Sequence, residues 1–342
     1  MKIKIDNIGM LKKAEVKLNG LTVVAGVNDT GKSTLGKLLF ASIKADNIRR
    51  QQKAKIPKET TMATWLNLVF DRNVTNNGNM VLLGDKEEEL LKLDIKDKNF
   101  VKGYKYDSKN IATFFDATLI QSPIVFDLIE FFDGVGKLKE MRRMEIGGRY
   151  GLDFDFSYPI VLWDLYTKIS LQNPFPRSKN FHEISEKIQK IIGGEFIKSS
   201  KLEFNKYFNS KVIKTEILNT AYGIKSFGLL QLLNNNGYLN RKYLLILDEP
   251  EVHLHPEWQV KYAELIANLV KNGIYILVNS HSPYMIQAIK HYSKQYKLED
   301  KTNFYLAEKE KDEIQANIVD KTDDLSSIFY KLSEPLKKIV WN

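Results

Sequence analysis

The sequence predicts an α/β fold in which short buried strands alternate with helices, and three observations carry this prediction. One apolar run, residues 21–25, is rich in β-branched residues and leads through a glycine-rich turn into a helix. A second run, residues 243–247, ends in two carboxylates and precedes a helix that begins with Pro256. A third run, residues 274–278, ends in a polar cluster. The chain of 342 residues is long enough for one large or two ordinary domains.

The first apolar run leads into the strongest motif of the chain. Residues 26–34, GVNDTGKST, match the phosphate-binding P-loop pattern G-x-x-x-x-G-K-[ST], with a predicted strand before it and a helix after it. Backbone N–H groups of such a turn and the N-terminus of the helix favour phosphate oxygens. We expect Lys32 to reach the β- and γ-phosphates and the Ser33 hydroxyl to bind Mg²⁺. The predicted phosphate-binding residues are Gly26, Asn28, Asp29, Thr30, Gly31, Lys32, Ser33 and Thr34.

The composition is that of a globular protein without disulfides. Hydrophobic residues make up 43% and charged residues 27% of the chain, and the absence of cysteine excludes a disulfide framework and a thiolate metal site. The N-terminal residues lack the apolar core of a signal peptide and no run reaches membrane-spanning length, so we expect a cytoplasmic protein without a membrane partner. The net charge of +9 suits a nucleic-acid partner, but a generally lysine-rich proteome explains it equally well.

Hydrophobic spacing and turn residues predict the elements of the N-terminal third. We expect helices at residues 31–45 and 62–70, and strands at residues 2–8, 14–18, 21–25, 80–83, 91–95 and 117–120. The strand before the P-loop would then be the third strand of an N-terminal sheet. The last of these strands ends in Gln121, and a helix that follows a proline is expected at residues 124–132.

The middle of the chain contains no nucleotide-binding motif. Residues 158–170 and 182–192 have the spacing of amphipathic helices, so we interpret residues 126–194 as a helical insertion. Beyond the insertion we expect a meander of short strands at residues 195–197, 201–204 and 212–218, and helices at residues 227–233, 256–270 and 326–340.

The second strong motif has the form of a Walker B strand. Residues 244–247 are apolar and would fix the strand in the core of a sheet, and Asp248 and Glu249 follow directly. Asp248 at the carboxyl end of the strand would hold the water shell of Mg²⁺ opposite Ser33. Glu249 would orient and deprotonate the attacking water. Lys32 and Asp248 are 216 positions apart (248 − 32), which is more chain than a small GTPase-like domain needs.

The segment from Asp248 to Pro256, DEPEVHLHP, resembles the Walker B motif and D-loop of bacterial AAA-family ATPases related to the overcoming-lysogenization-defect (OLD) ATPases. These are ABC-type enzymes, similar to chromosome-maintenance and recombination-repair ATPases. The resemblance covers roughly residues 1–45 and 215–290. It implies a P-loop NTPase fold with a single ABC-type ATPase head over residues 1–342, divided into an N-terminal lobe at 1–125, a helical insertion at 126–194 and a C-terminal lobe at 195–342.

The resemblance also implies roles for residues outside the two motifs. Gln121 is similar to the Q-loop glutamine, which contacts Mg²⁺ and senses the γ-phosphate. His281 is similar to the H-loop histidine, which contacts the γ-phosphate and helps to place the water. The implied metal ligands are therefore Ser33, Gln121 and Asp248, and the implied catalytic residues are Glu249, His281 and Lys32.

Residues 222–226, YGIKS, occupy the position of the signature motif, which in the family docks on the ATP of the other protomer. Gly223, Lys225 and Ser226 are expected to donate hydrogen bonds to the γ-phosphate from the turn before a helix. The sequence departs from the family pattern, because Tyr222 stands where a serine is usual and Ile224 replaces the second glycine.

The H-x-H pair formed by His253 and His255 has three readings. Metal binding lacks a nearby third ligand and any cysteine. The alternatives are a D-loop role at a dimer interface and plain packing.

The resemblance implies Mg²⁺-dependent ATP hydrolysis at two composite sites in a head-to-tail homodimer or higher oligomer. OLD enzymes carry a C-terminal nuclease domain, for which residues 290–342 are too few, so we expect a separately encoded effector, a nuclease or toxin. The first hypothesis is the ATPase subunit of a bacterial phage-defence system. The alternatives are a DNA-repair or chromosome-maintenance ATPase acting on DNA, and an ATP-binding sensor or scaffold with little hydrolysis.

Overall fold

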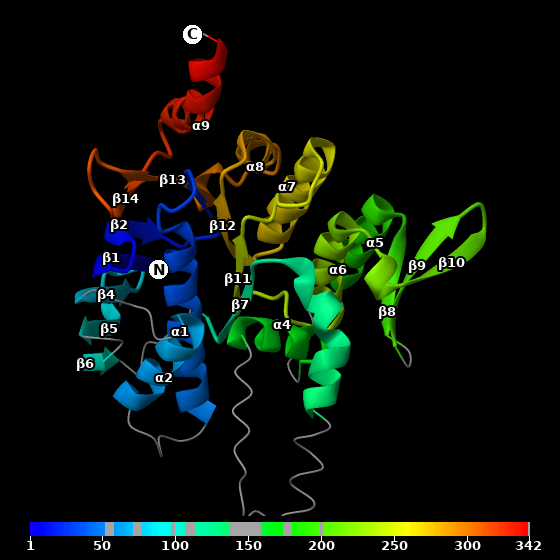
Figure 1. The fold of residues 1–342 in the computed structure, drawn as a ribbon, viewed down its shortest axis with the longest axis horizontal. Helices are drawn as coiled ribbons and strands as arrows, with labels where there is room; N and C mark the ends of the chain where they lie inside the picture. The colour runs from blue at the N-terminus through cyan, green and yellow to red at the C-terminus, as the bar shows by residue number, and fades with distance from the viewer. Residues whose placement is uncertain are drawn as a thin grey trace, which may run out of the picture.

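The computed structural model describes residues 1–51, 58–70, 77–96, 100–106, 114–136, 159–173, 180–198 and 201–340. Its strands are β1 (Lys2–Ile8), β2 (Leu11–Lys17), β3 (Leu21–Ala25), β4 (Gly78–Leu83), β5 (Glu89–Lys96), β6 (Phe100–Tyr106), β7 (Asp116–Ile120), β8 (Gly194–Lys198), β9 (Leu202–Phe208), β10 (Lys211–Glu216), β11 (Tyr243–Asp248), β12 (Tyr275–Ser280), β13 (Thr302–Lys309) and β14 (Ala316–Asp320). Eleven of them form one mixed sheet in the order β6-β5-β4-β1-β2-β14-β13-β3-β12-β11-β7 (Figure 1).

Helices cover both faces of this sheet. The helices of the described ranges are α1 (Lys32–Gln51), α2 (Lys58–Phe70), α4 (Ile160–Ser170), α5 (Phe181–Ile192), α6 (Tyr222–Asn235), α7 (Pro256–Lys271), α8 (Pro283–Gln295) and α9 (Leu325–Val340), with 3₁₀ turns η1 (Pro123–Leu128), η2 (Ile217–Asn219) and η3 (Glu299–Lys301). Residues 129–136 are also helical. No helix within the described ranges is both long enough and apolar enough to cross a membrane.

Five strands at one end of the sheet, β7, β11, β12, β3 and β13, run parallel to one another. Their register places Ser280 beside Ala25 and Asp248 beside Asn279. Because the carboxyl ends of parallel strands lie at the same edge, the segments that follow β3, β7, β11 and β12 meet there. This edge is where the predicted functional residues gather.

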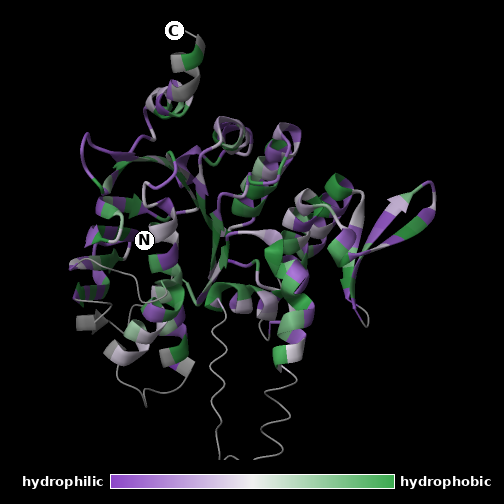
Figure 2. Ribbon diagram, viewed as in Figure 1, coloured by the Kyte–Doolittle hydropathy of each residue, from purple (hydrophilic) through white to green (hydrophobic). Residues whose placement is uncertain are grey.

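Burial on both faces explains why the central strands are continuously apolar. Val23 and Leu245 pack into a core with α6 and α7, whereas Val24 and Leu244 pack into a second core with α1. Hydrophobic residues accordingly gather along the central strands (Figure 2). The polar residues at the ends of these strands are thus held by a rigid, doubly covered sheet.

The arrangement of the N-terminal strands differs from the expected one. The strand before the P-loop, β3, does not pair with β2, because β14 and β13 from the C-terminal part lie between them. Strands β1 and β2 instead form a hairpin that continues through β4 and β5 in antiparallel pairing. Sequence spacing identified the strands but carried no information about this long-range pairing.

Several elements were missed or misplaced by the sequence patterns. No prediction was made for α8, β13 or β14, although Ser282 caps α8 with its side chain and Pro283 occupies the first turn. The expected helix at residues 124–132 begins as the 3₁₀ turn η1 and becomes α-helical from residue 129. Helix α6 begins at Tyr222 and not at Phe227, so residues 222–226 lie within its first turns.

A separate three-stranded antiparallel sheet, in the order β10-β9-β8, contains the predicted meander (Figure 1). Strand β8 packs against α6, where Phe196 lies directly above Gly228. The boundaries of the predicted lobes and of the insertion stay a prediction, and residues 137–158 and 174–179 of that insertion lie outside the described ranges.

Candidate functional site

The P-loop has the tight backbone that its glycines predict. Gly31 has a φ of +78°, and a Cβ atom there would lie 2.6 Å from the Leu11 side chain. A Cβ atom on Gly26 would lie 2.6 Å from the carbonyl oxygen of Ala307 on the neighbouring strand β13. Asp29 also has a positive φ, and an ion pair of 2.6 Å with Lys309 holds its side chain. The loop is therefore fixed to β13 and to the β1–β2 turn.

Lys32 is buried beneath this loop and bonded to it. Its Nζ atom donates to the carbonyl oxygens of Gly26, at 2.9 Å, and Val27, at 2.7 Å. Burial lowers the pKa of the Lys32 ammonium below its ordinary value, although Glu249 and Asp248 oppose this effect. A phosphate group would be a stronger partner for this ammonium than two neutral carbonyl groups.

Of the three predicted metal ligands, Ser33 and Gln121 both donate hydrogen bonds to the third, Asp248. The Ser33 hydroxyl donates to one carboxylate oxygen at 3.1 Å, and the Gln121 amide donates to the other at 3.3 Å. A hydroxyl, a carboxylate and an amide oxygen are the hard oxygen ligands that Mg²⁺ prefers. The chemistry of this donor set therefore fits Mg²⁺, which Ser33 and Asp248 would hold with Gln121 beside them.

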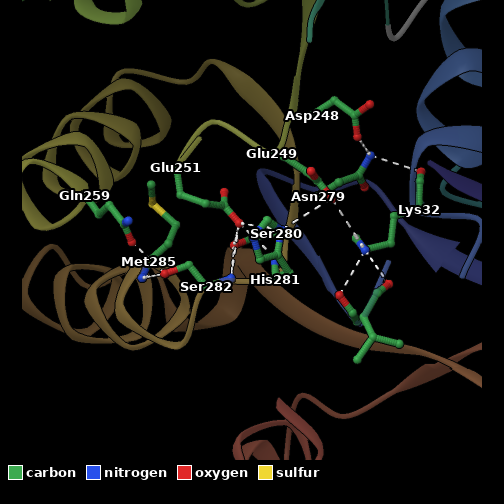
Figure 3. A network of polar contacts seen from close by, with 12 residues as sticks. Lys32, Asp248, Glu249, Glu251, Gln259, Asn279, Ser280, His281, Ser282 and Met285 are labelled. Carbon is green, nitrogen blue, oxygen red and sulfur yellow. Dashed lines mark hydrogen bonds and ion pairs between the residues drawn. The ribbon is translucent and has the colours of Figure 1, made fainter. Parts of the chain in front are cut away.

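Glu249 and His281 lie next to this cluster (Figure 3). Glu249 has a φ of +53°, and its Oε1 atom lies 3.8 Å from the Lys32 Nζ atom and 3.4 Å from the His281 Nδ1 atom. Both side chains are partly exposed, at 30% for Glu249 and 40% for His281. They are thus accessible to a substrate, whereas Asp248 is buried.

The remaining P-loop residues differ in exposure. Asn28 and Asp29 are exposed at the tip, and Thr34 is half-buried at the start of α1. Thr30 is buried and its hydroxyl donates to the carbonyl of Val27 at 2.8 Å. Thr30 therefore stabilises the loop from inside, whereas Asn28 and Asp29 face solvent.

The signature-position residues form a cluster of their own. Lys225 is buried and its ammonium donates to Asp127 at 2.5 Å, and the Tyr222 hydroxyl also donates to Asp127. Burial raises the pKa of the Asp127 carboxyl, but the bonds from Lys225 and Tyr222 outweigh it and hold the pKa below its ordinary value. The Ser226 hydroxyl donates back to the carbonyl of Tyr222 at 3.1 Å.

Because the first turns of α6 direct these side chains inward, Lys225 and Ser226 do not project from a turn as expected. No hydrogen bond or ion pair within the described part of the chain joins Gly223, Lys225 or Ser226 to the P-loop. Ser226 does line a small cleft together with Gln121, Asp248 and Glu249. The predicted role of the three residues toward a second protomer stays a prediction.

The two histidines of the H-x-H pair, His253 and His255, make different contacts. The His253 ring lies 5.0 Å from the Tyr222 ring, which favours packing beside the signature position. The His255 Nδ1 atom accepts a hydrogen bond from the Glu257 backbone and caps α7.

Sequence reasoning missed two residues of the site, Asn279 and Glu251. The Asn279 amide is fully buried and donates to Asp248 at 2.8 Å and to the Lys32 carbonyl at 3.0 Å. The Glu251 carboxylate is buried beside the turn that carries His281. Glu251 stands within the segment 248–256 already quoted. Asn279 directly follows the third apolar run, and an amide at the end of a buried strand was the available signal for it.

Fold and site together define an α/β P-loop NTPase fold. Residues 231–287, which contain Asp248, Glu249 and His281, match a family model described as "AAA domain, putative AbiEii toxin, Type IV TA system". The Septu protein PtuA from Bacillus thuringiensis is 22% identical over 307 residues, which cover 84% of this chain and 72% of that protein.

A solved structure of an SMC head shares the fold. The head of an Smc protein bound to the C-terminal winged-helix domain of ScpA matches with a TM-score of 0.51 and 13% identity, over 95% of this chain and 98% of that one. The SMC head domain from Thermotoga maritima matches with a TM-score of 0.46 and 12% identity, over 93% and 97%. The predicted α/β P-loop NTPase fold is confirmed. The relation to OLD ATPases stays a hypothesis.

Proposed function

We propose that this chain is an ATPase that hydrolyses Mg²⁺–ATP in a head-to-tail dimer and thereby switches a separate effector. The observation that carries the proposal is the convergence of Lys32, Asp248, Glu249 and His281 at one edge of the sheet, although the chain separates the first two by 216 positions. Lys32 can bind the β- and γ-phosphates, and bound Mg²⁺ would neutralise charge on them.

Each remaining residue has a role in the proposed reaction. Glu249 accepts the proton of a water whose oxygen attacks the γ-phosphorus, and the bond from this phosphorus to the β–γ bridging oxygen breaks to release ADP. His281, whose Nδ1 atom lies 3.4 Å from Glu249 Oε1, would contact the transferred phosphoryl group. Asp248 and Ser33 would hold Mg²⁺.

Glu249→Gln tests this assignment, because it removes the base and keeps the shape of the side chain. We expect ATP turnover to fall by about 10²–10⁴-fold while ATP binding is retained. The matched control is Glu257→Gln on the exposed side of α7, which leaves turnover unchanged. Unchanged turnover in Glu249→Gln would remove Glu249 as the base. Turnover absent from the wild-type chain would favour a sensor or scaffold.

The same variant tests the dimer. A closed dimer that cannot hydrolyse its ATP persists, so Glu249→Gln with Mg²⁺–ATP is expected to sediment at twice the monomer mass, and without ATP as a monomer. The signature-like position of residues 222–226 supports a site that a second protomer completes. A monomer under both conditions would contradict the dimer.

Similarity to the Septu protein PtuA, and to a family model that names a toxin of a type IV system, supports an ATPase subunit of a bacterial phage-defence system. In this proposal the effector is a separately encoded nuclease or toxin. Purification of the tagged chain together with the product of a neighbouring reading frame tests it, and a chain that purifies alone from its own host would contradict it.

The net charge of +9 favours a second candidate, an ATPase that acts on DNA directly. This candidate predicts ATP turnover that DNA stimulates and that falls steeply with salt. Turnover that DNA does not change would favour the effector proposal.

A further inference from the structure

A buried carboxylate holds the turn that follows β12. The Glu251 Oε1 atom accepts hydrogen bonds from the Ser280 hydroxyl at 2.7 Å, the His281 backbone N–H at 2.7 Å and the Ser282 backbone N–H at 3.1 Å (Figure 3). Only 3% of the Glu251 side chain is exposed. One oxygen atom thus binds three consecutive residues of the turn that carries His281.

The burial of the Glu251 carboxylate has a free-energy cost that other interactions must offset. Burial of a carboxylate is unfavourable without compensating donors or an opposite charge. The Glu251 Oε2 atom has no hydrogen-bond partner, and in the described part of the chain no lysine or arginine forms an ion pair with Glu251. The three bonds to the turn therefore provide its compensation, and they fix the backbone of His281.

The result is a defined position for the His281 ring. Its Nδ1 atom lies 3.4 Å from Glu249 Oε1 and 3.5 Å from Glu251 Oε1, so the ring nitrogen faces two carboxylates. The Nδ1 atom is buried and forms no hydrogen bond to the described residues, so the position of the ring follows from the backbone that Glu251 holds. Glu251 therefore contacts both the backbone N–H and the ring of His281.

A second set of bonds continues the network to α7. The Ser282 hydroxyl donates to the Gln259 Oε1 atom at 2.5 Å, and the Gln259 amide donates to the carbonyl of Leu254 at 3.0 Å. Leu254 belongs to the loop between Glu251 and α7, and its own N–H donates to the Glu251 carbonyl at 2.9 Å. The turn after β12 and the loop after β11 are therefore tied together at both ends.

We infer that Glu251 is a positioning residue for ATP hydrolysis, which sets His281 beside Glu249 by holding the turn after β12. This inference rests on the proposed function. It assigns Glu251 no contact with substrate, since the residue is buried behind the turn. Glu251→Ala would release the turn and His281 with it, whereas Glu251→Gln keeps an acceptor oxygen at the same place.

The test is a double-mutant cycle between Glu251 and His281 with steady-state ATP turnover as the readout. We expect Glu251→Ala to lower kcat by about 10–100-fold with KM for ATP changed by less than about threefold, and Glu251→Gln to recover most of this loss. In a His281→Ala background, Glu251→Ala is expected to lower kcat by less than about twofold, because its effect passes through the ring. The matched control is Glu257→Ala.

Amide hydrogen exchange of the chain without nucleotide provides a readout that does not need hydrolysis. Glu251→Ala is expected to speed exchange at His281 and Ser282 and leave the amides of β11 unchanged. Equal losses of kcat in both backgrounds, or unchanged exchange at the turn, would overturn the inference. If the wild-type chain does not hydrolyse ATP, the proposed function fails, and the exchange experiment alone decides whether Glu251 holds the turn.

Discussion

Asp248 accepts hydrogen bonds from three side chains that three different elements supply. Ser33 comes from α1, Gln121 follows β7 and Asn279 lies on β12. Ser33 and Gln121 would turn toward a bound metal, whereas Asn279 is fully buried and keeps its place. Asn279 therefore orients the carboxylate from behind, as outer-shell partners of metal ligands do.

This geometry predicts a metal-dependent phenotype for Asn279→Ala. Without its amide, Asp248 loses the donor that orients it, so the Mg²⁺ concentration for half-maximal ATP turnover is expected to rise by about 10–100-fold. A Mg²⁺ titration of turnover at saturating ATP measures it. Asn272→Ala, at the end of α7, is the control. An unchanged Mg²⁺ requirement in Asn279→Ala would contradict this role.

Sequence motifs identified the residues of the site whose roles are local. Lys32, Ser33 and Asp248 each follow from a short pattern in which strand, turn and helix are contiguous. Asn279 and Glu251 were missed because their roles depend on neighbours from other strands. A buried amide or carboxylate has the same sequence signature whether it orients a ligand or ends a strand, and only the packing of β11 beside β12 separates the two cases.

A buried ionic network joins three elements at the opposite end of β7 from Gln121. Lys44 on α1 and Lys168 on α4 both form ion pairs with Asp116 on β7 and with Asp164 on α4. Lys168 also donates to the carbonyl of Ala117 at 2.6 Å. Two cations thus face two anions, which ties α4 to the P-loop helix.

Removal of one cation from this network should be destabilising. Lys168→Met leaves two aspartates facing Lys44 alone, and loss of one buried partner costs about 3–5 kcal/mol. The double variant Lys168→Met with Asp164→Leu leaves one matched pair, so we expect it to recover most of that stability. Urea unfolding measures both. A double variant that is less stable than Lys168→Met would show that the charges do not need to balance.

The network also predicts acid sensitivity. Burial raises the pKa of Asp116, but Lys168 and Lys44 outweigh burial and leave the pKa below its ordinary value of 3.8. A lowered carboxyl pKa contributes stability that is present above the unfolded-state value and is lost as the pH falls below it. The wild-type advantage over Asp116→Asn in urea midpoint is therefore expected to shrink below pH 3.8. A constant advantage across this range would contradict the pKa direction.

At the level of elements, the strands with apolar runs and the P-loop helix were predictable, but α6 and the C-terminal strands were not. Helix α6 begins five residues earlier than its apolar run (227 − 222), because Lys225 and Ser226 are buried polar residues that hydrophobic spacing does not count. Strands β13 and β14 contain polar residues at their edges, and their place between β3 and β2 depends on pairing across most of the chain.

The whole molecule brings both ends of its chain into one sheet. Strand β3 from the N-terminal part lies between β12 and β13 from the C-terminal part, so the P-loop and the His281 turn cannot form independently. This interleaving explains how a separation of 216 positions closes into one site. The fold class was predictable from the two motifs, whereas the interleaving was not.

The structure of Glu249→Gln crystallised with Mg²⁺ and ATP tests the central claim most directly. The account predicts phosphates against residues 26–34, a metal ion about 2.0–2.1 Å from the Ser33 hydroxyl oxygen, and Lys32 released from the Gly26 and Val27 carbonyls onto phosphate oxygens. Nucleotide bound elsewhere, or Lys32 still on those two carbonyls beside a bound nucleotide, would contradict it.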